Sequence, residues 1–336
     1  MRIAVIGAGA VGGLVAALAA RAGHEVLVTA RGGAHAETIA LAGLRVSGGW
    51  GEWGAPVELV ESIPSQPVDL LVLATKAHDS RAALAPWAAH DGTPVLVLQN
   101  GLGGEAAVRD SLPHSPVAIG LALFAVSLTG PGHVTVTGPN GLTLGGDPAA
   151  VAVAELLMRD ALPDDGTAEL VLTDDIQGAQ WTKLLINQVN ALPAITGLSV
   201  QQSIADPGLR DVLARGIVET VAVGDALGVR WGRIGAVDAD AVAAVRAGGP
   251  GAAATLAERL AAAMGDVPNP ASMLQSVRRG RRTEVDAING AVVELGARLG
   301  VPTPVNAALV GLVHRVERSG RSLPPLEATT SIPPST

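Results

Sequence analysis

The first part of the chain alternates between short, strongly apolar runs and longer segments in which Ala is mixed with polar residues. The short runs, rich in Val, Ile and Leu, span residues 3–6, 25–29, 70–74, 95–98 and 117–121. Such runs are typical of strands buried on both faces, and the segments between them are typical of helices that cover a sheet. The alternation continues to about residue 144 and predicts βαβ units that build a parallel sheet.

Two later runs predict the edge of this sheet. Residues 133–137 and 141–144 are apolar or β-branched, and Gly138, Pro139 and Asn140 separate them. Because Gly, Pro and Asn are residues that turns favour, we expect the two runs to pair as a hairpin.

After about residue 172 the apolar residues recur at helical spacing. The expected helices span residues 174–190, 206–227, 252–264, 271–279, 283–299 and 304–318. The pattern predicts a first domain over residues 1–170 and a helical second domain over residues 171–320. Residues 321–336 are rich in Pro, Ser and Thr, which favours a frayed tail.

Composition narrows the class of protein. With 336 residues, 48% of them hydrophobic, the chain is long enough for two cores. A net charge of −8 argues against a nucleic-acid partner, because phosphate neutralisation needs a basic surface. There is no Cys, which excludes disulfides and thiolate nucleophiles, and the seven His residues lack a metal-ligand spacing, so we expect no metal.

The sequence also indicates where in the cell the protein is found. No uninterrupted apolar stretch reaches the ~18 residues of a membrane span, so we expect no membrane partner. The apolar run at Met1–Ile6 breaks at Gly7, which argues against a secretion signal. We therefore expect the protein in the cytoplasm.

A glycine-rich motif follows the first predicted strand directly. It consists of Gly7, Ala8, Gly9, Ala10, Val11 and Gly12, and an Ala-rich helical segment begins within it. In dinucleotide-binding folds the first Gly of GxGxxG permits a tight turn, the second lets the backbone approach the pyrophosphate, and the third lets the helix pack closely. The alternative is a glycine-rich turn without a ligand. With the strand pattern, the motif predicts the α/β class: an N-terminal Rossmann-type doubly wound parallel sheet, followed by an all-helical C-terminal domain.

The end of the second predicted strand indicates which dinucleotide is bound. An NAD enzyme usually carries Asp or Glu there, but this chain continues with Ala30 and Arg31. A guanidinium can bind a 2′-phosphate through charge-assisted hydrogen bonds, so the hypothesis is NADPH as cofactor. The alternative is a solvated Arg in a loop.

Two further strand ends carry polar residues that point to the same edge of the sheet. Lys76 follows the run at 70–74, and Asn100 follows the run at 95–98. Lys76 is a candidate for contacts with cofactor phosphates or a substrate carboxylate, and Asn100 for contacts with ribose, nicotinamide or substrate. Either residue could be of no functional consequence, since Asn-Gly is an ordinary turn signal.

Candidate chemistry in the second half begins with three polar residues on one predicted helix. Lys183, Asn187 and Asn190 are spaced i, i+4, i+7 and share a face. Their neighbours are mostly apolar, and Asn is a poor helix former, which favours a functional stripe over a merely solvated one. Ser272 and Glu284 form a second candidate group. The alternative to a functional role is that Ser272 caps a helix and that Glu284 stabilises the first turn of one.

Several segments occur in the order found in ketopantoate (2-dehydropantoate) reductases, which the chain resembles over nearly its whole length. They are GAGAVGG, TKAHDS, QNGLG, WTKLLINQVNALPAITG, SMLQSVRRGRRTEVDAING and GVPTPVN. The glycine-rich loop is common to many dehydrogenases, whereas K-x3-N together with S-M-x-Q and TE-x-D-x-I-N-G is specific to this family.

The resemblance implies roles for the second group of residues. Lys183 would be the general acid and Glu284 would bind and orient the substrate, while Asn100, Asn187, Asn190 and Ser272 would complete a substrate pocket between the domains. Many relatives carry the second Asn eight residues after the Lys, where this chain has Ala191. That shift leaves the substrate contact of Asn190 an open question.

Three functions remain in competition. The first is NADPH-dependent reduction of 2-dehydropantoate to pantoate, a step of pantothenate and coenzyme A biosynthesis. The second is the same scaffold acting on another 2-oxo or β-hydroxy acid, and the third is a non-catalytic NADPH-binding sensor. The expected partner is a small 2-oxo acid, and a homodimer is expected by analogy with other helical second domains.

Overall fold

The computed structural model describes residues 1–333, and these form two compact units. Unit 1 consists of Met1–Gln99 and Gly103–Ile176, and unit 2 of Asn100–Leu102 and the chain from Gln177 onward. Each unit has its own hydrophobic core. The change between units falls a few residues after the expected boundary, because a last strand at Leu170–Leu172 still pairs within unit 1.

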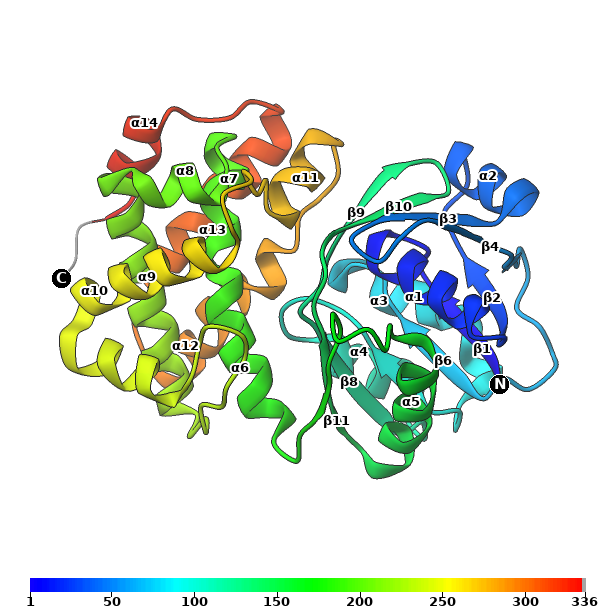
Figure 1. Ribbon diagram of the computed structural model, residues 1–336. Coiled ribbons are helices and arrows are strands. Elements are labelled where there is room, and N and C mark those ends of the chain that lie inside the picture. The colour runs from blue at the N-terminus through cyan, green and yellow to red at the C-terminus, as the bar shows by residue number, and fades with distance from the viewer. Residues whose placement is uncertain (334–336) are drawn as a thin grey trace. The chain divides into compact units, whose positions relative to one another are not determined.

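The larger sheet of unit 1 is built on buried parallel strands (Figure 1). Its strand order is β12-β11-β8-β7-β6-β1-β2-β5. The strands are β1 (Arg2–Ile6), β2 (Glu25–Thr29), β5 (Glu58–Leu59), β6 (Leu70–Leu73), β7 (Val95–Val97), β8 (Val117–Ala122), β11 (Leu142–Gly146) and β12 (Leu170–Leu172). Neighbours from β5 to β8 pair in parallel, and only β11 against β8 is antiparallel. The expected doubly wound parallel sheet is therefore confirmed.

The chain reverses its direction across this sheet beside β1. It passes from β1 to β2 on one side and later returns to β6 on the other side. The helices of unit 1 are α1 (Ala10–Arg21), α2 (Ala34–Ala42), α3 (Ser80–Leu84), α4 (Gly104–Ser111) and α5 (Pro148–Ala161). In open α/β sheets a ligand binds outside the carboxyl ends of the strands at such a reversal. The loops after β1, β2 and β6 are therefore the candidate ligand-binding loops.

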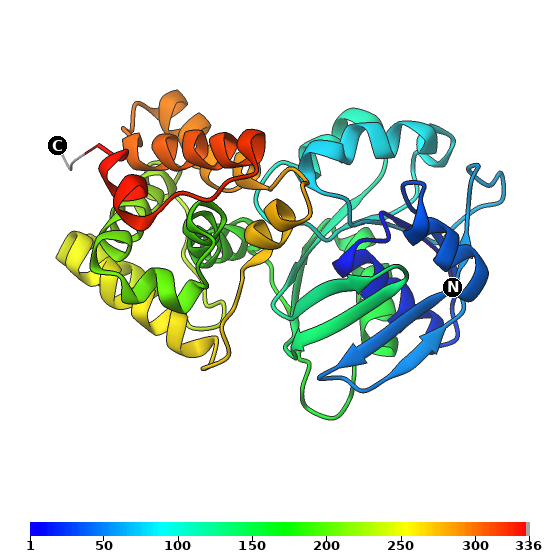
Figure 2. The same cartoon turned by 90° about the horizontal axis from the view of Figure 1, so that it is seen from above.

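A second, smaller sheet packs on α1 and was not predicted from the sequence. It has the order β4-β3-β10-β9 and consists of β3 (Leu44–Gly48), β4 (Trp53–Ala55), β9 (Ala125–Gly130) and β10 (His133–Gly138). Val134 and Val136 of β10 are buried in the same core as Leu14 of α1. Helix α1 thus lies between the larger sheet and this smaller one (Figure 2).

The predicted hairpin of residues 133–137 and 141–144 is wrong. β10 pairs with β9 and β3, whereas β11 pairs with β8 and β12, so the two runs belong to different sheets. The turn-like residues between them carry the chain from one sheet to the other. Alternating apolar residues show that β10 has a buried face, but they do not show which elements cover that face.

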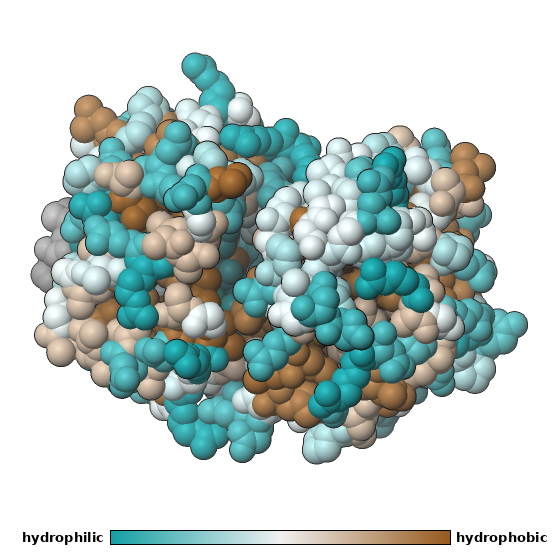
Figure 3. All heavy atoms as spheres, in the orientation of Figure 1, coloured by the Kyte–Doolittle hydropathy of each residue, from teal (hydrophilic) through white to brown (hydrophobic). Residues whose placement is uncertain are grey.

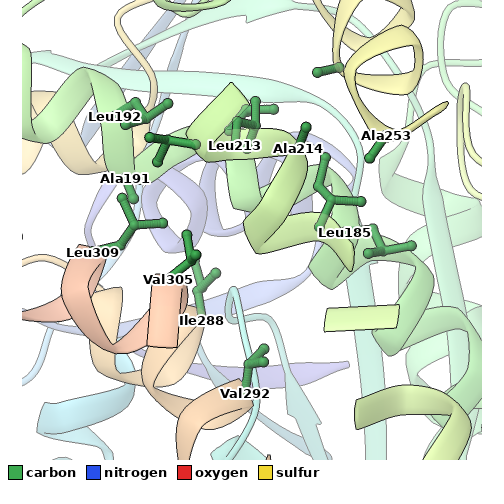
Figure 4. Packing of buried hydrophobic residues seen from close by; sticks show 14 of the residues in the cluster. Leu185, Ala191, Leu192, Leu213, Ala214, Ala253, Ile288, Val292, Val305 and Leu309 are labelled. Carbon is green, nitrogen blue, oxygen red and sulfur yellow. The ribbon is translucent and has the colours of Figure 1, made fainter. Parts of the chain in front are cut away.

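Unit 2 is built from helices, as expected. They are α6 (Ile176–Asn187), α7 (Ala191–Thr196), α8 (Val200–Ala205), α9 (Pro207–Ala226), α10 (Ala239–Ala263), α11 (Ser272–Arg278), α12 (Asn289–Leu299), α13 (Pro304–Ser319) and α14 (Pro325–Thr330). Leu, Val, Ile and Ala side chains from α6, α7, α9, α10, α12 and α13 meet in its core (Figure 4). Trp181 and Trp231 lie in the same core and meet edge to face.

Several segments of unit 2 depart from the expected helices. Helix α10 begins at Ala239 instead of residue 252 and runs through the expected break with a kink at Gly249, and α7 and α8 form where no helix was expected. The helix expected over 174–190 ends at Asn187 and continues as a 3₁₀ turn, Gln188–Asn190. The helix expected over 283–299 starts only at Asn289, after a 3₁₀ turn at Val285–Ala287. Where a frayed tail was expected, α14 forms and Leu323, Ala328 and Ile332 are buried, while residues 334–336 lie outside the described residues.

The outer surface is mixed in character. Polar and weakly polar residues predominate on the face shown in Figure 3, with smaller apolar areas between them. Among residues 1–333, no helix is long and apolar enough to cross a membrane.

Candidate active site

The glycine-rich loop in unit 1 has three glycines in three different environments. Gly7 has φ +101°, and a Cβ there would lie 2.8 Å from the Cγ2 of Thr75. At Gly12 a Cβ would lie 2.0 Å from the carbonyl oxygen of Gly7, so the loop and α1 approach too closely for any side chain. At Gly9 a Cβ would meet nothing within 4 Å. The first and third glycines are required by the fold itself, and the second faces open space.

The N-terminus of α1 suits an anion. Gly9 is its N-cap residue and supplies no side-chain cap, and the first turn has no acidic residue. The first N–H groups of a helix lack intrahelical acceptors and carry a partial positive charge, so they attract phosphate. The open space at Gly9 and these uncapped amides fit the pyrophosphate of a dinucleotide.

The loop after β2 places Arg31 near an acidic residue. The Arg31 side chain is 73% exposed, and its guanidinium lies 3.6 Å from the carboxylate of Asp79, which is 34% exposed. Asp79 ends the short 3₁₀ turn Ala77–Asp79 that follows Lys76. The positive charge of Arg31, the candidate residue for binding a 2′-phosphate, is therefore partly neutralised by Asp79, which sequence reasoning did not identify.

A glutamine holds the loop that carries Lys76. The Nε2 of Gln99 donates to the backbone oxygen of Thr75 at 2.6 Å and to the Oγ of Ser80 at 2.8 Å. These bonds tie the end of β7 to the loop after β6. Gln99 stood in a motif quoted from the sequence, but nothing in the pattern indicated that it shapes this loop.

The segment Asn100–Leu102 belongs to unit 2 and is fixed to the turn that follows Glu284. The N–H of Leu102 donates to the carbonyl oxygen of Ala287 at 2.9 Å. Gly101 has φ +78°, and a Cβ there would lie 2.3 Å from the same oxygen. The Asn-Gly pair is thus more than an ordinary turn signal, because glycine permits a close approach that brings Asn100 to the Glu284 segment.

Lys183 and Glu284 form an electrostatically coupled pair in unit 2. Lys183 lies on α6 with 8% of its surface exposed, and Glu284 is 7% exposed. Burial lowers the pKa of Lys183 to about 8, and the negative charge of Glu284 opposes this shift by favouring the ammonium form. A pKa of about 8 leaves this buried amine mostly protonated at neutral pH.

Local hydrogen bonds fix the turn that carries Glu284. The N–H of Thr283 donates to the Glu317 carboxylate at 2.6 Å, and the N–H of Val285 donates to the Thr283 Oγ1 at 3.2 Å. Glu284 therefore sits on a backbone that is held from both sides. The helix α12 starts only at Asn289, so Glu284 does not lie in its first turn.

Asn190 links the end of α6 to the start of α11. Its Nδ2 donates to the carbonyl oxygen of Asn187 at 3.0 Å, and its Oδ1 accepts from the N–H of Ser272 at 3.3 Å. Ser272 follows Ala271, the one residue other than glycine with positive φ (56°) among residues 1–333. Asn190 thus has a structural task at this junction, in addition to any contact with a substrate.

A chain of buried amides supports the same region, and sequence reasoning missed it. The Glu219 carboxylate accepts from the N–H and the Nδ2 of Asn306, the latter at 2.8 Å. The Oδ1 of Asn306 accepts from the Nδ2 of Asn289 at 3.0 Å, which also donates to the Oε1 of Gln188 at 2.8 Å. Because a carboxylate accepts only, Glu219 fixes the orientation of Asn306, and each amide then fixes the next. Gln188 lies in the 3₁₀ turn next to Asn187.

Two sequence profiles cover most of the chain. The profile described as "Ketopantoate reductase PanE/ApbA" matches residues 3–148, and its C-terminal counterpart matches residues 175–317. A 2-dehydropantoate 2-reductase of Archaeoglobus fulgidus is 32% identical, over 94% of this chain and 98% of the relative. One from Halobacterium salinarum is also 32% identical, over 95% and 100%.

The chain belongs to the ketopantoate reductase family. It is therefore an oxidoreductase. A PanE/ApbA family ketopantoate reductase from Ralstonia eutropha JMP134 has a structure similar to this one, with a TM-score of 0.79, 30% identity, and coverage of 95% of this chain and 99% of that one. A D-mandelate dehydrogenase, solved with NADH and anilino(oxo)acetate, is similar at a TM-score of 0.80 and 26% identity, with 95% and 99% coverage.

The structure of this family member gathers the candidate residues into two groups. Unit 1 holds the glycine-rich loop, Arg31 and Lys76, which follow the carboxyl ends of β1, β2 and β6. The residues held by unit 2 are Asn100, Lys183, Asn187, Asn190, Ser272 and Glu284. The two lysines of the chain, Lys76 and Lys183, both fall within these groups, while all the other basic residues among the 23 Lys and Arg are arginines.

Proposed function

We propose that the protein reduces 2-dehydropantoate to pantoate with NADPH. The observation that carries the proposal is the buried Lys183, whose pKa is lowered to about 8 while the charge of Glu284 favours its protonated form. Membership of the ketopantoate reductase family supports an enzyme over a sensor, and the curated relatives named above are 2-dehydropantoate 2-reductases.

The cofactor would be held by unit 1. The loop from Gly7 to Gly12 and the amides of α1 would bind the pyrophosphate, and the exposed Arg31 would bind the 2′-phosphate that distinguishes NADPH from NADH. Lys76 and Asn100 would add polar contacts. The bound nicotinamide supplies the hydride, and the chain's own groups must bind the acid and manage the proton.

Lys183 would donate the proton. Addition of hydride to a keto carbon leaves an alkoxide, which an ammonium in a buried site both stabilises and protonates. An arginine could stabilise the charge but could not release a proton, because its pKa lies far above neutral pH. The use of lysine at position 183, in a chain whose other basic residues except Lys76 are arginines, fits a role that requires deprotonation.

The remaining polar residues of unit 2 would bind the substrate. Glu284 would accept a hydrogen bond from a substrate hydroxyl while it keeps Lys183 protonated. Asn187 and Ser272 would contribute further hydrogen bonds, and the side chain of Asn190 would act at the Ser272 junction with its remaining hydrogen-bonding capacity free for substrate. Amides and hydroxyls suit a small, polar, anionic acid.

A second candidate is a 2-oxo acid with another side chain. The similarity to a D-mandelate dehydrogenase favours this alternative, because that protein shares the fold at a TM-score of 0.80. The cytoplasm as the site of action and a homodimer as the assembly accompany either candidate as proposals, and sedimentation of the purified protein tests the latter.

The deciding experiment follows NADPH absorbance in the presence of 2-dehydropantoate. NADH is tested in parallel, as are phenylglyoxylate and 2-oxo acids with aliphatic side chains. The proposal expects the highest kcat/KM for NADPH with 2-dehydropantoate. A higher kcat/KM for another acid would select the second candidate, and no turnover of any acid would refute both.

A further inference from the structure

His35, at the start of α2, uses both of its ring nitrogens within unit 1. Its Nε2 lies 2.6 Å from the carbonyl oxygen of Ala8, and its Nδ1 lies 3.0 Å from the backbone nitrogen of Gly132. A backbone N–H can only donate and a carbonyl oxygen can only accept. The two partners therefore require the neutral ring with the proton on Nε2, which donates to Ala8, while Nδ1 accepts from Gly132.

The bond to Ala8 determines where the next amide points. The Ala8–Gly9 peptide is trans, so its C=O and N–H point in opposite directions. With the carbonyl of Ala8 directed at His35, the N–H of Gly9 is directed away from it. Ala8 is buried and Gly9 exposed, and no oxygen within residues 1–333 accepts a hydrogen bond from the Gly9 N–H. This amide is thus presented to an outside acceptor at the N-terminus of α1.

Gly132 in turn fixes the histidine. It lies in the turn between β9 and β10 of the smaller sheet, and its carbonyl oxygen accepts from the N–H of Arg45 on β3 at 2.8 Å. Gly132 has φ +63°, and a Cβ there would lie 2.8 Å from the Cγ2 of Thr38 on α2. Because the turn is held on both sides, the imidazole is braced by the smaller sheet, which also packs on α1.

We propose that His35 is a positioning residue for the cofactor: it orients the Ala8–Gly9 peptide so that the Gly9 amide faces the pyrophosphate. The proposal rests on the proposed use of a nicotinamide dinucleotide. It gives the smaller sheet a task, since the β9–β10 turn holds the imidazole that holds the loop. His35 itself contacts neither cofactor nor substrate in this account.

Two substitutions separate the two hydrogen bonds. In His35→Gln the side-chain amide nitrogen can take the place of Nε2 and donate to Ala8, whereas in His35→Asn the amide oxygen can take the place of Nδ1 and accept from Gly132. His35→Ala removes both bonds. His114→Gln is the matched control, because His114 is an exposed histidine that pairs with Asp91.

The test measures the dissociation constants of NADPH and NADH by fluorescence, together with the thermal unfolding temperature of each variant. We expect His35→Ala and His35→Asn to weaken NADPH binding about 3- to 10-fold, the range of one hydrogen bond. His35→Gln should bind NADPH within about 2-fold of the wild type, because it keeps the hydrogen bond to the Ala8 carbonyl oxygen. With saturating cofactor, kcat and the KM for the 2-oxo acid should be unchanged in all variants.

Three results would overturn the proposal. Unchanged NADPH binding in all His35 variants would refute the role of His35 alone, and the proposed function would stand. Rescue by Asn instead of Gln would show that His35 acts only on the β9–β10 turn. A wild-type protein that binds neither NADPH nor NADH would refute the proposed function together with this inference.

Discussion

The glycine-rich loop and the Lys183–Glu284 pair create their candidate sites by opposite means. The loop works through its backbone: it omits side chains at Gly9 and Gly12, and it leaves the first amides of α1 uncapped. The pair works through two buried side chains from segments about a hundred residues apart, in which the charge of Glu284 favours the protonated form of Lys183. A backbone site is specified by a few adjacent residues, whereas a buried charge pair requires the whole helical unit to fold around it.

This difference predicts how each region responds to substitution. Changes in the loop should alter cofactor binding and local packing while the proton-transfer chemistry is preserved. Changes at the pair should alter the chemical step and its pH dependence while cofactor binding is preserved.

The largest expected effect is the loss of the amine. Lys183→Ala should lower kcat by roughly 10²–10⁴-fold, because no other group then protonates the alkoxide, and Lys183→Arg should fail similarly since guanidinium retains its proton. NADPH affinity, measured by fluorescence, should stay within about 2-fold of the wild type in both variants.

The charge-matched control is Lys76→Ala, which removes the other lysine of the chain. It should raise the KM for NADPH without a comparable loss of kcat. If Lys183→Ala kept a near-native kcat, Lys183 would be no more than a buried structural residue.

The next effect concerns the choice of cofactor. Arg31→Ala should lower the preference for NADPH over NADH about 10- to 100-fold, the range of a lost charge-assisted bond to phosphate. Asp79→Asn should act in the opposite direction and by less, about 2- to 3-fold, since it removes a partly exposed carboxylate beside Arg31. The ratio of kcat/KM for the two cofactors measures both, and equal ratios in wild type and Arg31→Ala would return Arg31 to a solvated loop residue.

A further contrast, read in stability instead of catalysis, separates two glycines of the same loop. Gly12→Ala places a methyl group 2.0 Å from the Gly7 carbonyl oxygen, so it should destabilise unit 1 by about 1–3 kcal/mol and lower its unfolding temperature. Gly9→Ala meets nothing within 4 Å and should leave that temperature unchanged while it weakens NADPH binding. Equal loss of stability in both variants, measured by thermal unfolding, would contradict the assignment of open space to Gly9.

The elements of the fold that could be predicted are those with a local signature. β2 begins and ends where the apolar run predicts, at Glu25–Thr29, and the helical character of unit 2 follows from periodicity. The smaller sheet could not be predicted, because its strands are short and pair across about ninety residues of chain, as β3 does with β10. The late start of α12 was missed because the turn after Glu284 depends on the distant Glu317 carboxylate.

The residues of the candidate site likewise separate into those with a local sequence signature and those that depend on distant partners. The glycines, Arg31 and the Lys183–Asn187 spacing are visible in the sequence, since each depends on neighbours within one motif. Gln99, Asp79 and the amide chain from Glu219 to Gln188 were missed, because their partners are distant in sequence and only folding brings them together. Asn190 was placed on a continuous helix, whereas it lies one 3₁₀ turn after Asn187 and bonds to it.

The central claim is that Lys183 delivers the proton under the control of Glu284, and the pH dependence of kcat/KM for the 2-oxo acid tests it most directly. Reduction requires the ammonium form, so kcat/KM for the wild type should be flat at neutral pH and fall as pH rises through about 8, the pKa of Lys183. Because the charge of Glu284 raises that pKa, Glu284→Gln should move the fall to lower pH. A wild-type profile that stays flat well above pH 8, or a fall that moves to higher pH in Glu284→Gln, would contradict the account.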